Sequence, residues 1–350
     1  MSSGIIRNAG VQAGIASAVL FGAGTPAAKL LLGEVSPWLL AGLLYAGSGL
    51  GLGLYRTARR LPRVRLAPDE RLPLSGAVLF GGLLGPVLLM AGLAGMPASG
   101  ASLLLNAEGA FTALLAWFVF RENVDRRIAL GMAAILGGAV VLAVPTGGVE
   151  FGSGWSSLAV LAACLCWGID NNLTRKVALT DATWLAAVKG AAAGPVNLVL
   201  AFLLGAAVPP AGSVVAAMGV GLLAYGVSLV LFIVALRQVG TARAGAYFSV
   251  APFFGAVVAL ALGEPLTAPL LVAATLMALG VWLHLSERHE HEHTHPAVRH
   301  DHWHRHDDGH HDHPHAEPVP AGTWHLHEHV HDAVTHTHPH FPDSHHRHAH

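Results

Sequence analysis

Charge is the first thing that this sequence has little of. Asp, Glu, Lys and Arg make up 12% of the 350 residues, whereas hydrophobic residues make up 53%. A soluble domain usually carries about 25% charged residues. The composition therefore excludes an ordinary soluble domain and indicates a membrane protein.

The chain also has few cysteines, no histidine before residue 284 and no recognisable enzyme motif. Cys164 and Cys166, the two cysteines, lie in one apolar run at a spacing that places them on different helix faces, so no disulfide framework is expected. All 24 histidines lie at or after His284. The phosphate-binding pattern GxxxxGK[ST] and other enzyme motifs do not occur. We therefore expect no enzymatic activity, no nucleic-acid partner and no required cofactor.

The small net charge of −1 conceals two oppositely charged parts. Residues 1–286 carry a net charge of +6, and residues 287–350 carry −7 together with nearly all of the histidines. We therefore treat the chain as an apolar membrane body followed by a polar, histidine-rich tail.

The membrane body contains ten apolar runs, each about as long as a bilayer-spanning helix. They are residues 10–32, 37–55, 73–95, 97–119, 128–145, 155–173, 183–206, 212–236, 244–262 and 268–285. They lack the alternation of a β-barrel strand, so helices must satisfy the backbone within the lipid. The first run continues too far for a signal peptide. The predicted fold class is an all-α integral membrane protein with ten transmembrane helices.

Positive charge collects in alternate loops. Six arginines lie within residues 56–71, and the other loops of this set contain Arg121, Arg126, Arg127, Arg175, Lys176, Arg237 and Arg243. The intervening connections contain only Glu34, Glu150 and Glu264 as charged residues. Because cytoplasmic loops are enriched in Lys and Arg, both termini are predicted to be cytoplasmic in a multi-pass protein of the cell membrane (inner or plasma membrane).

The two halves of the body repeat a pattern. Phe21-Gly22 recurs as Trp167-Gly168, Gly82 as Gly226, and Glu122 as Glu264, at offsets that fall from 146 to 142. Five spans per half is an odd number, so the second copy enters the membrane from the opposite side. The predicted domains are 1–145 and 146–286, two inverted five-span repeats, and 287–350, the tail. Such repeats place a substrate site near the midplane of many secondary transporters.

Two segments carry a family resemblance: SLLLNAEGAFTALLAWFVFRE, starting at Ser102, and AYFSVAPFFGAVVALALGEPLT, starting at Ala246. They resemble the two EamA repeats of the drug/metabolite transporter superfamily, over about residues 10–286. The resemblance implies a ten-helix carrier with a central cavity, often an exporter of amino acids, metabolites or drugs. Gly109 stands where the family usually has proline, although Pro252 keeps it in the second half. The histidine-rich tail is not part of the family pattern.

Four ionisable residues lie within the predicted spans, where each costs a few kcal/mol and suggests a function. Glu108 is close to the midplane, and burial favours its neutral form, so it could carry a coupling proton or bind a cationic group of the substrate. Lys29 either reaches the headgroups or serves the substrate. Asp170 and Lys189 either form a structural ion pair or contact the substrate. The predicted substrate and coupling residues are Glu108, Asn106, Lys29, Asp170, Asn171, Lys189 and Tyr247.

Histidine alternates with other residues along the tail, which contains many prolines and few large apolar residues, so disorder is predicted. Imidazoles with interleaved carboxylates suit Zn²⁺, Ni²⁺, Co²⁺ or Cu²⁺, but no fixed ligand geometry can be derived. The alternative is a solvated polar tail. The candidate ligands are His289, His291, His293, His295, His300, His302, His304, His306, His325, His327, His329 and His331.

The leading functional hypothesis is a secondary transporter that exports a small metabolite, amino acid or drug, with proton coupling as one mechanism. The alternative is a transition-metal carrier (Zn, Ni or Co) whose tail captures or senses the ion. A membrane-tethered metal buffer would explain the tail but not the repeat. The expected partners are the lipid bilayer, a small-molecule substrate and divalent metal ions, and a homodimer is left open.

Overall fold

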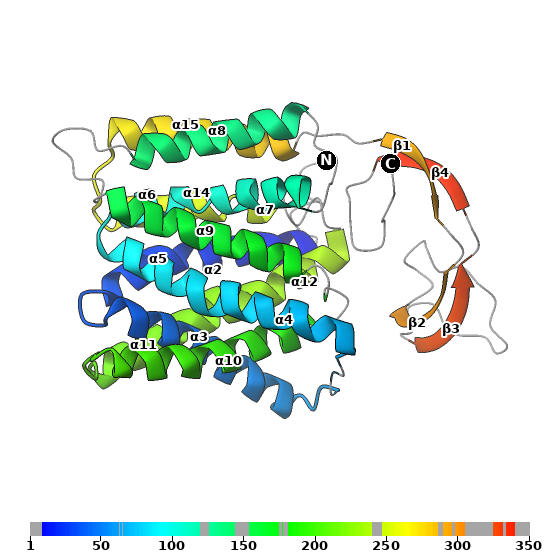
Figure 1. Cartoon of the computed structure of the whole chain (residues 1–350), viewed down its shortest axis with the longest axis horizontal. Coiled ribbons are helices and arrows are strands. Elements are labelled where there is room, and N and C mark those ends of the chain that lie inside the picture. Colours follow the sequence, from blue (N-terminus) through cyan, green and yellow to red (C-terminus); the bar gives the residue numbers. More distant parts are fainter. Residues whose placement is uncertain are drawn as a thin grey trace. The chain divides into compact units, whose positions relative to one another are not determined.

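The structure is a computed structural model of the full chain, and its body consists of helices (Figure 1). It describes residues 9–62, 64, 66–119, 126–143, 154–174, 177, 181–239 and 247–285, and in the tail 290–295, 298–304, 325–331 and 334–339. The chain divides into two units, Met1–Glu287 and Arg288–His350, which are considered separately.

A described helix lies within each of the ten predicted apolar runs. In the first half these are α2 (Ala9–Leu31), α3 (Pro37–Ala58), α4 (Arg71–Ala77), the π-helix η2 (Val78–Leu84), α5 (Gly85–Ala94), α6 (Ala98–Leu104), α7 (Ala107–Phe118) and α8 (Arg126–Ala143), with the short 3-10 helix η1 (Pro68–Glu70) before α4. In the second half they are α9 (Gly154–Thr174), α10 (Ala182–Leu203), α11 (Ala211–Gly221), the π-helix η4 (Leu222–Val227), α12 (Ser228–Val239), α14 (Ala251–Ala261) and α15 (Ala268–Leu285).

Six of these helical segments are long and apolar enough to cross a membrane by length and composition. They are Ala9–Leu31, Pro37–Ala58, Pro68–Ala94, Arg126–Ala143, Thr183–Leu203 and Ala211–Ala235. This finding supports a multi-pass, helical membrane protein. The count of ten spans stays a prediction.

The fourth predicted run is not the continuous helix that the sequence suggested. It is divided into α6 and α7 by a turn at Leu105 and Asn106. The side-chain amide of Asn106 donates to the carbonyl oxygen of Leu103 at 2.9 Å, beside a backbone bond from Asn106 N to the same oxygen at 3.0 Å. Asparagine side chains compete in this way with the regular helical ladder. The apolar composition concealed the break.

Both halves contain a π-helix at the same place. The segment η2 begins at Val78 and η4 begins at Leu222, which is the offset of 144 that also relates Gly82 to Gly226. Each lies in the middle of a long helical segment, between α4 and α5 or between α11 and α12. Short π-helical insertions are rare and often occur at functional sites.

Several helix pairs join one helix of the first half to one helix of the second half. α3 packs against α10 and α8 against α15, which joins corresponding spans of each half. α2, in the first span of the first half, packs against α12, in the third span of the second half. The same pairing occurs with the halves reversed, because α9 packs against α5. In Figure 1, α8 and α15 lie side by side at one edge of the body.

Glycine permits the close approach of α3 to α10. A Cβ atom at Gly49 would collide with the backbone nitrogen of Ala191, and a Cβ at Gly190 would collide with the backbone of Gly49. By contrast, a Cβ at Gly53 would meet nothing within 4 Å. Small residues bring membrane helices together in this way, because lipid removes the hydrophobic driving force between them.

The composition of the tail predicted disorder, but part of the tail forms strands. Its described residues form four strands, β1 (Glu290–His295), β2 (Val298–His304), β3 (His325–His331) and β4 (Val334–Pro339). β1 pairs with β4 and β2 with β3, both antiparallel. The alternation of histidine with other residues has the period of a β-strand, a second reading of the pattern that predicted disorder.

Candidate functional site

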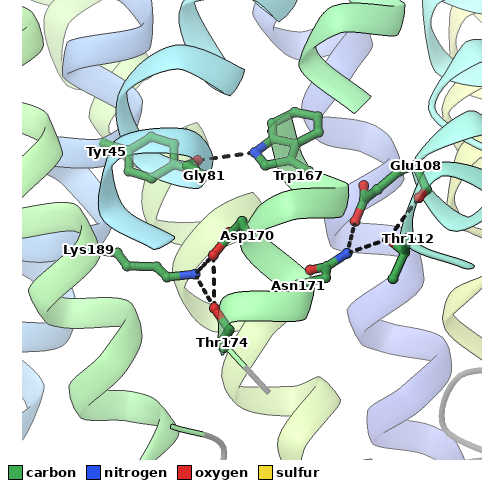
Figure 2. Close-up of polar contacts among 9 residues, drawn as sticks. All are labelled: Tyr45, Gly81, Glu108, Thr112, Trp167, Asp170, Asn171, Thr174 and Lys189. Atoms are coloured by element: carbon green, nitrogen blue, oxygen red, sulfur yellow. Dashed lines mark hydrogen bonds and ion pairs between the residues drawn. The ribbon is translucent and has the colours of Figure 1, made fainter. Parts of the chain in front are cut away.

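Glu108 lies in the first turn of α7, directly after the break in the fourth run. The amide nitrogen Nδ2 of Asn171, on α9, donates to Glu108 Oε1 at 2.8 Å and lies 3.2 Å from Thr112 Oγ1. Thr112 Oγ1 in turn donates to the backbone oxygen of Glu108 at 2.8 Å. Figure 2 shows these three side chains facing one another between the two helices.

This contact is partly exposed rather than enclosed in the core of the helix bundle. Asn171 is exposed and Glu108 is only partly buried, whereas the neighbouring Asn172 is buried. Asn172 Nδ2 donates to Gly168 O at 2.8 Å and to Thr112 O at 3.2 Å, which fixes α9 against α7. The polar face of α9 therefore has a structural part, Asn172, and an accessible part, Asn171.

Asp170 and Lys189 form a buried ion pair between α9 and α10. Lys189 Nζ lies 2.5 Å from Asp170 Oδ1, and the two side chains are only 11% (Asp170) and 15% (Lys189) exposed. Thr174 Oγ1 donates to Asp170 Oδ1 at 2.8 Å and accepts from Lys189 Nζ at 3.0 Å (Figure 2). The structure thus contains the ion pair, which is one of the two alternatives that the sequence left open.

Consecutive residues of α9 serve different neighbours. Asp170 reaches α10 and Asn171 reaches α7, because one residue advances a helix by about 100°. Gly81 of η2 leaves room for Asp170, since a Cβ at Gly81 would collide with its carboxylate. The two polar clusters are thus linked through a single helix.

The carbonyl oxygen of Gly81 accepts two side-chain hydrogen bonds. Tyr45 OH donates to it at 2.6 Å and Trp167 Nε1 at 3.1 Å. Gly81 lies within the π-helix η2. The ring of Tyr45 also contacts the ring of Tyr225, with 5.5 Å between their centroids. Tyr225 in turn contacts Phe21, with 6.0 Å between the ring centroids. This region therefore combines buried polar groups with aromatic rings from both halves.

The other predicted site residues occupy separate surroundings. Lys29 Nζ donates to Leu93 O at 2.7 Å, at the end of α5. Asn106 is buried and, besides Leu103, lies 3.8 Å from Met277 Sδ. Tyr247 packs beside Gly14 of α2. None of the contacts described above for these three residues involves Glu108.

The sequence did not single out two charged contacts at the ends of helices. Glu264 accepts from the backbone N–H groups of Ala98 and Ser99. The other contact is the ion pair of Arg56 with Asp181, at 3.0 Å. Sequence signals existed for both, because Glu264 ends its span and Asp181 precedes α10 as a capping residue.

Asp181 lies just before its span and has a shifted pKa. Partial burial opposes its ionisation, but hydrogen bonds from Thr183 and Arg56 outweigh burial. The backbone N–H of Trp184 also donates to this carboxylate, at 3.1 Å. Together these donors lower the pKa of Asp181, so the pair with Arg56 persists at neutral pH.

No group of three or more His, Cys, Asp or Glu side chains is placed to hold a metal ion in the part of the chain that the structure describes. His289 and His306 lie outside the described residues, as do Glu122, Arg121, Arg175 and Lys176. The predicted metal ligands in β1, β2 and β3 are described by their strand positions only.

The pattern of the EamA-like transporter family matches residues 8–144 and again residues 154–286. The chain belongs to the EamA-like transporter family. The protein is accordingly a membrane transporter and not an enzyme.

One sequence relative of this EamA-family transporter agrees with that assignment. An uncharacterized transporter of Methanothermobacter thermautotrophicus is 28% identical over 290 residues, which cover 77% of this chain and 84% of the relative. A crystal structure with 20% sequence identity and a TM-score of 0.59 covers 79% of this chain and 96% of its own. The second likeness concerns the fold alone.

Proposed function

We propose that this EamA-family protein is a secondary transporter that exports a small metabolite, amino acid or drug, with Glu108 as its coupling residue. The observation that carries the proposal is the hydrogen bond between Glu108 on α7 and the exposed Asn171 on α9. It joins the two helices through a carboxyl group that lies within a predicted span. Coupling to protons or to a cationic substrate group would act on that carboxyl.

A partly exposed polar pair within a predicted span favours contact with water or substrate. Carboxyl and amide groups facing lipid would cost several kcal/mol, so ionisable residues in spans usually face a water-filled cavity. Asn171 is exposed although it lies in an apolar helix that packs against α5 and α7. This favours an aqueous route that reaches Glu108.

The charges nearby make Glu108 the residue whose charge can change during transport. Asp170 and Lys189 neutralise each other at 2.5 Å. An ionised Glu108 therefore leaves the cluster with one uncompensated negative charge, which a proton or a cation can balance. Exchange of the two between opposite sides of the membrane gives coupled transport without ATP.

Two features support a carrier built from ten spans in two inverted repeats, residues 1–145 and 146–286. The π-helices recur at an offset of 144 residues, and helices of one half pack against helices of the other half. Inverted repeats allow one site to open alternately to each side. The loop charges predict cytoplasmic termini, so the proposed export carries substrate away from the side of the tail.

The test is transport by Glu108→Gln in proteoliposomes, after a panel of amino acids, metabolites and cationic drugs has identified a substrate of the unmodified protein. Glutamine keeps the hydrogen-bonding shape but cannot release a proton or carry charge. We expect the pH dependence of transport to disappear, with a loss of at least about tenfold in coupled flux, the size of effect that a few kcal/mol of electrostatic interaction provides.

The matched control is Glu34→Gln, because Glu34 lies in a connection between spans and bonds to Ser213 instead. It should transport with the pH dependence of the unmodified protein. Normal, fully pH-dependent transport by Glu108→Gln would show that the coupling role is wrong.

We propose in addition that the tail binds a divalent transition metal. In the β2–β3 pair, His300 stands opposite His329, His302 opposite His327 and His304 opposite His325. Positions two residues apart share a face of a strand ladder, which brings these register positions together. Imidazole suits Zn²⁺, Ni²⁺ and Co²⁺. A metal carrier remains the alternative function, but the described spans offer no ligand cluster for its path.

A further inference from the structure

Lys29 binds the end of α5 from a different span. Its ammonium group, on α2, donates to the carbonyl oxygens of Leu93 at 2.7 Å and Ala94 at 3.2 Å. These carbonyls belong to the last turn of α5. Carbonyl groups in the last turn of a helix have no N–H partner further along that helix. A cation at the C-terminal end of a helix is the arrangement that the helix dipole favours.

Glu264 binds the start of α6 on the other side of the same turn. Its two carboxylate oxygens accept from Ala98 N at 2.6 Å and from Ser99 N at 2.8 Å. Gly263 has a φ of 101°, and Glu264 N returns to Ala259 O at 3.2 Å, so the end of α14 holds this side chain in place. Lys29 and Glu264 thus place opposite charges on the two sides of one turn.

The two ends of the fourth run differ in burial. Every residue of α6, Ala98–Leu104, is buried. Beyond the turn at Asn106, Glu108 is partly buried and its partner Asn171 is exposed. The fourth run is therefore tightly packed along α6 and more exposed beyond the turn, around Glu108 and Asn171.

We infer that Lys29 and Glu264 form a latch that closes one side of the carrier by holding the turn between α5 and α6 (residues 95–97; Figure 1). This inference rests on the proposed transport function. The loop charges assign the latched side to the exterior. Release of the latch lets α6 move about the turn at Leu105 and Asn106 and exposes the site to that side, as hinged elements do in carriers and enzymes.

Cysteine labelling tests the latch directly. Ser102 of α6 is 1% exposed, and its hydroxyl has no hydrogen-bond partner in the described part of the protein, so Ser102→Cys in a Cys164→Ala, Cys166→Ala background places a reporter beneath the latch. A membrane-impermeant sulfhydryl reagent is applied to intact cells and to inside-out vesicles. We expect slow labelling from the latched side, and a rate about tenfold faster after Glu264→Gln, since a charge-assisted hydrogen bond contributes roughly that factor.

Lys29→Met should raise the same rate independently of Glu264, and Glu34→Gln, a carboxylate on the same predicted side that bonds to Ser213, should leave it unchanged. Size-exclusion profiles show that each variant is folded. Unchanged labelling in folded Glu264→Gln and Lys29→Met overturns the latch, as does an equal increase in Glu34→Gln. Labelling needs no substrate, so a failure of the coupling role of Glu108 leaves this result interpretable.

Discussion

At the scale of single residues, α9 separates a structural charge pair from an accessible polar contact. Asp170 and Lys189 satisfy each other and Thr174 in a nearly buried setting. The adjacent Asn171 is exposed and holds Glu108. Because Asp170 already holds Lys189, the carboxyl of Glu108 is the more available of the two acids. Proximity in sequence thus conceals a difference in role.

A double-mutant cycle distinguishes these roles. Asp170→Asn or Lys189→Met alone should lower stability by about 3–5 kcal/mol, since each leaves a buried charge without its partner. The double variant should lose clearly less than the sum of the two. Unfolding in mixed detergent micelles measures the effect. Single variants as stable as the unmodified protein would show that the pair is not structural and that Lys189 is available to substrate.

At the scale of helices, the contact of α3 with α10 depends on glycine at defined positions. The backbone of Gly49 lies directly against Ala191 and Gly190. The adjacent turn of α3 carries Gly53, which has open space around it. Composition alone does not distinguish these two glycines.

Alanine at the two positions should therefore have opposite effects. Gly49→Ala forces the helices apart and should cost about 1–3 kcal/mol, the usual range for an overpacked contact. Gly53→Ala should be neutral or slightly stabilising, because alanine favours a helix by up to about 1 kcal/mol over glycine. Thermal unfolding followed by size exclusion compares them. Equal losses in both variants would mean that helix propensity, and not the α3–α10 contact, determines the outcome.

The break between α6 and α7 shows where reasoning from the sequence ended at this scale. Residues 97–119 form an uninterrupted apolar run, so one helix was the natural prediction. Asn106 ends α6 through its bond to Leu103, a local contact that hydropathy does not register. The same limit applies to Glu264, which was recognised as a charge at the end of a span but not as the partner of Ala98 and Ser99.

At the scale of the whole molecule, the membrane body and the tail are separate units, Met1–Glu287 and Arg288–His350. The family match ends at residue 286, at the boundary of the body. The body carries the proposed transport site, and the tail carries the proposed metal ligands. The two functions should therefore be separable.

Truncation after Glu287 tests this separation. The shortened protein should keep the unfolding midpoint and the export activity of the full chain, and should lose the binding of Zn²⁺ or Ni²⁺ that titration calorimetry detects in the full chain. Metal content of cells that express either form measures the consequence. If the body alone alters cell metal content, the metal-carrier alternative replaces export of an organic substrate.

The sequence by itself determined the class of protein, because apolar runs, scarce charge and a repeated pattern are properties of composition and order. It also made Glu108 a candidate site residue, since a carboxyl within an apolar run is conspicuous without coordinates. Only the tertiary structure decided which polar residues meet. Asn171 joins Glu108, Asp170 joins Lys189, and Lys29 binds the end of α5, because helix rotation and packing bring together residues that lie far apart in the chain.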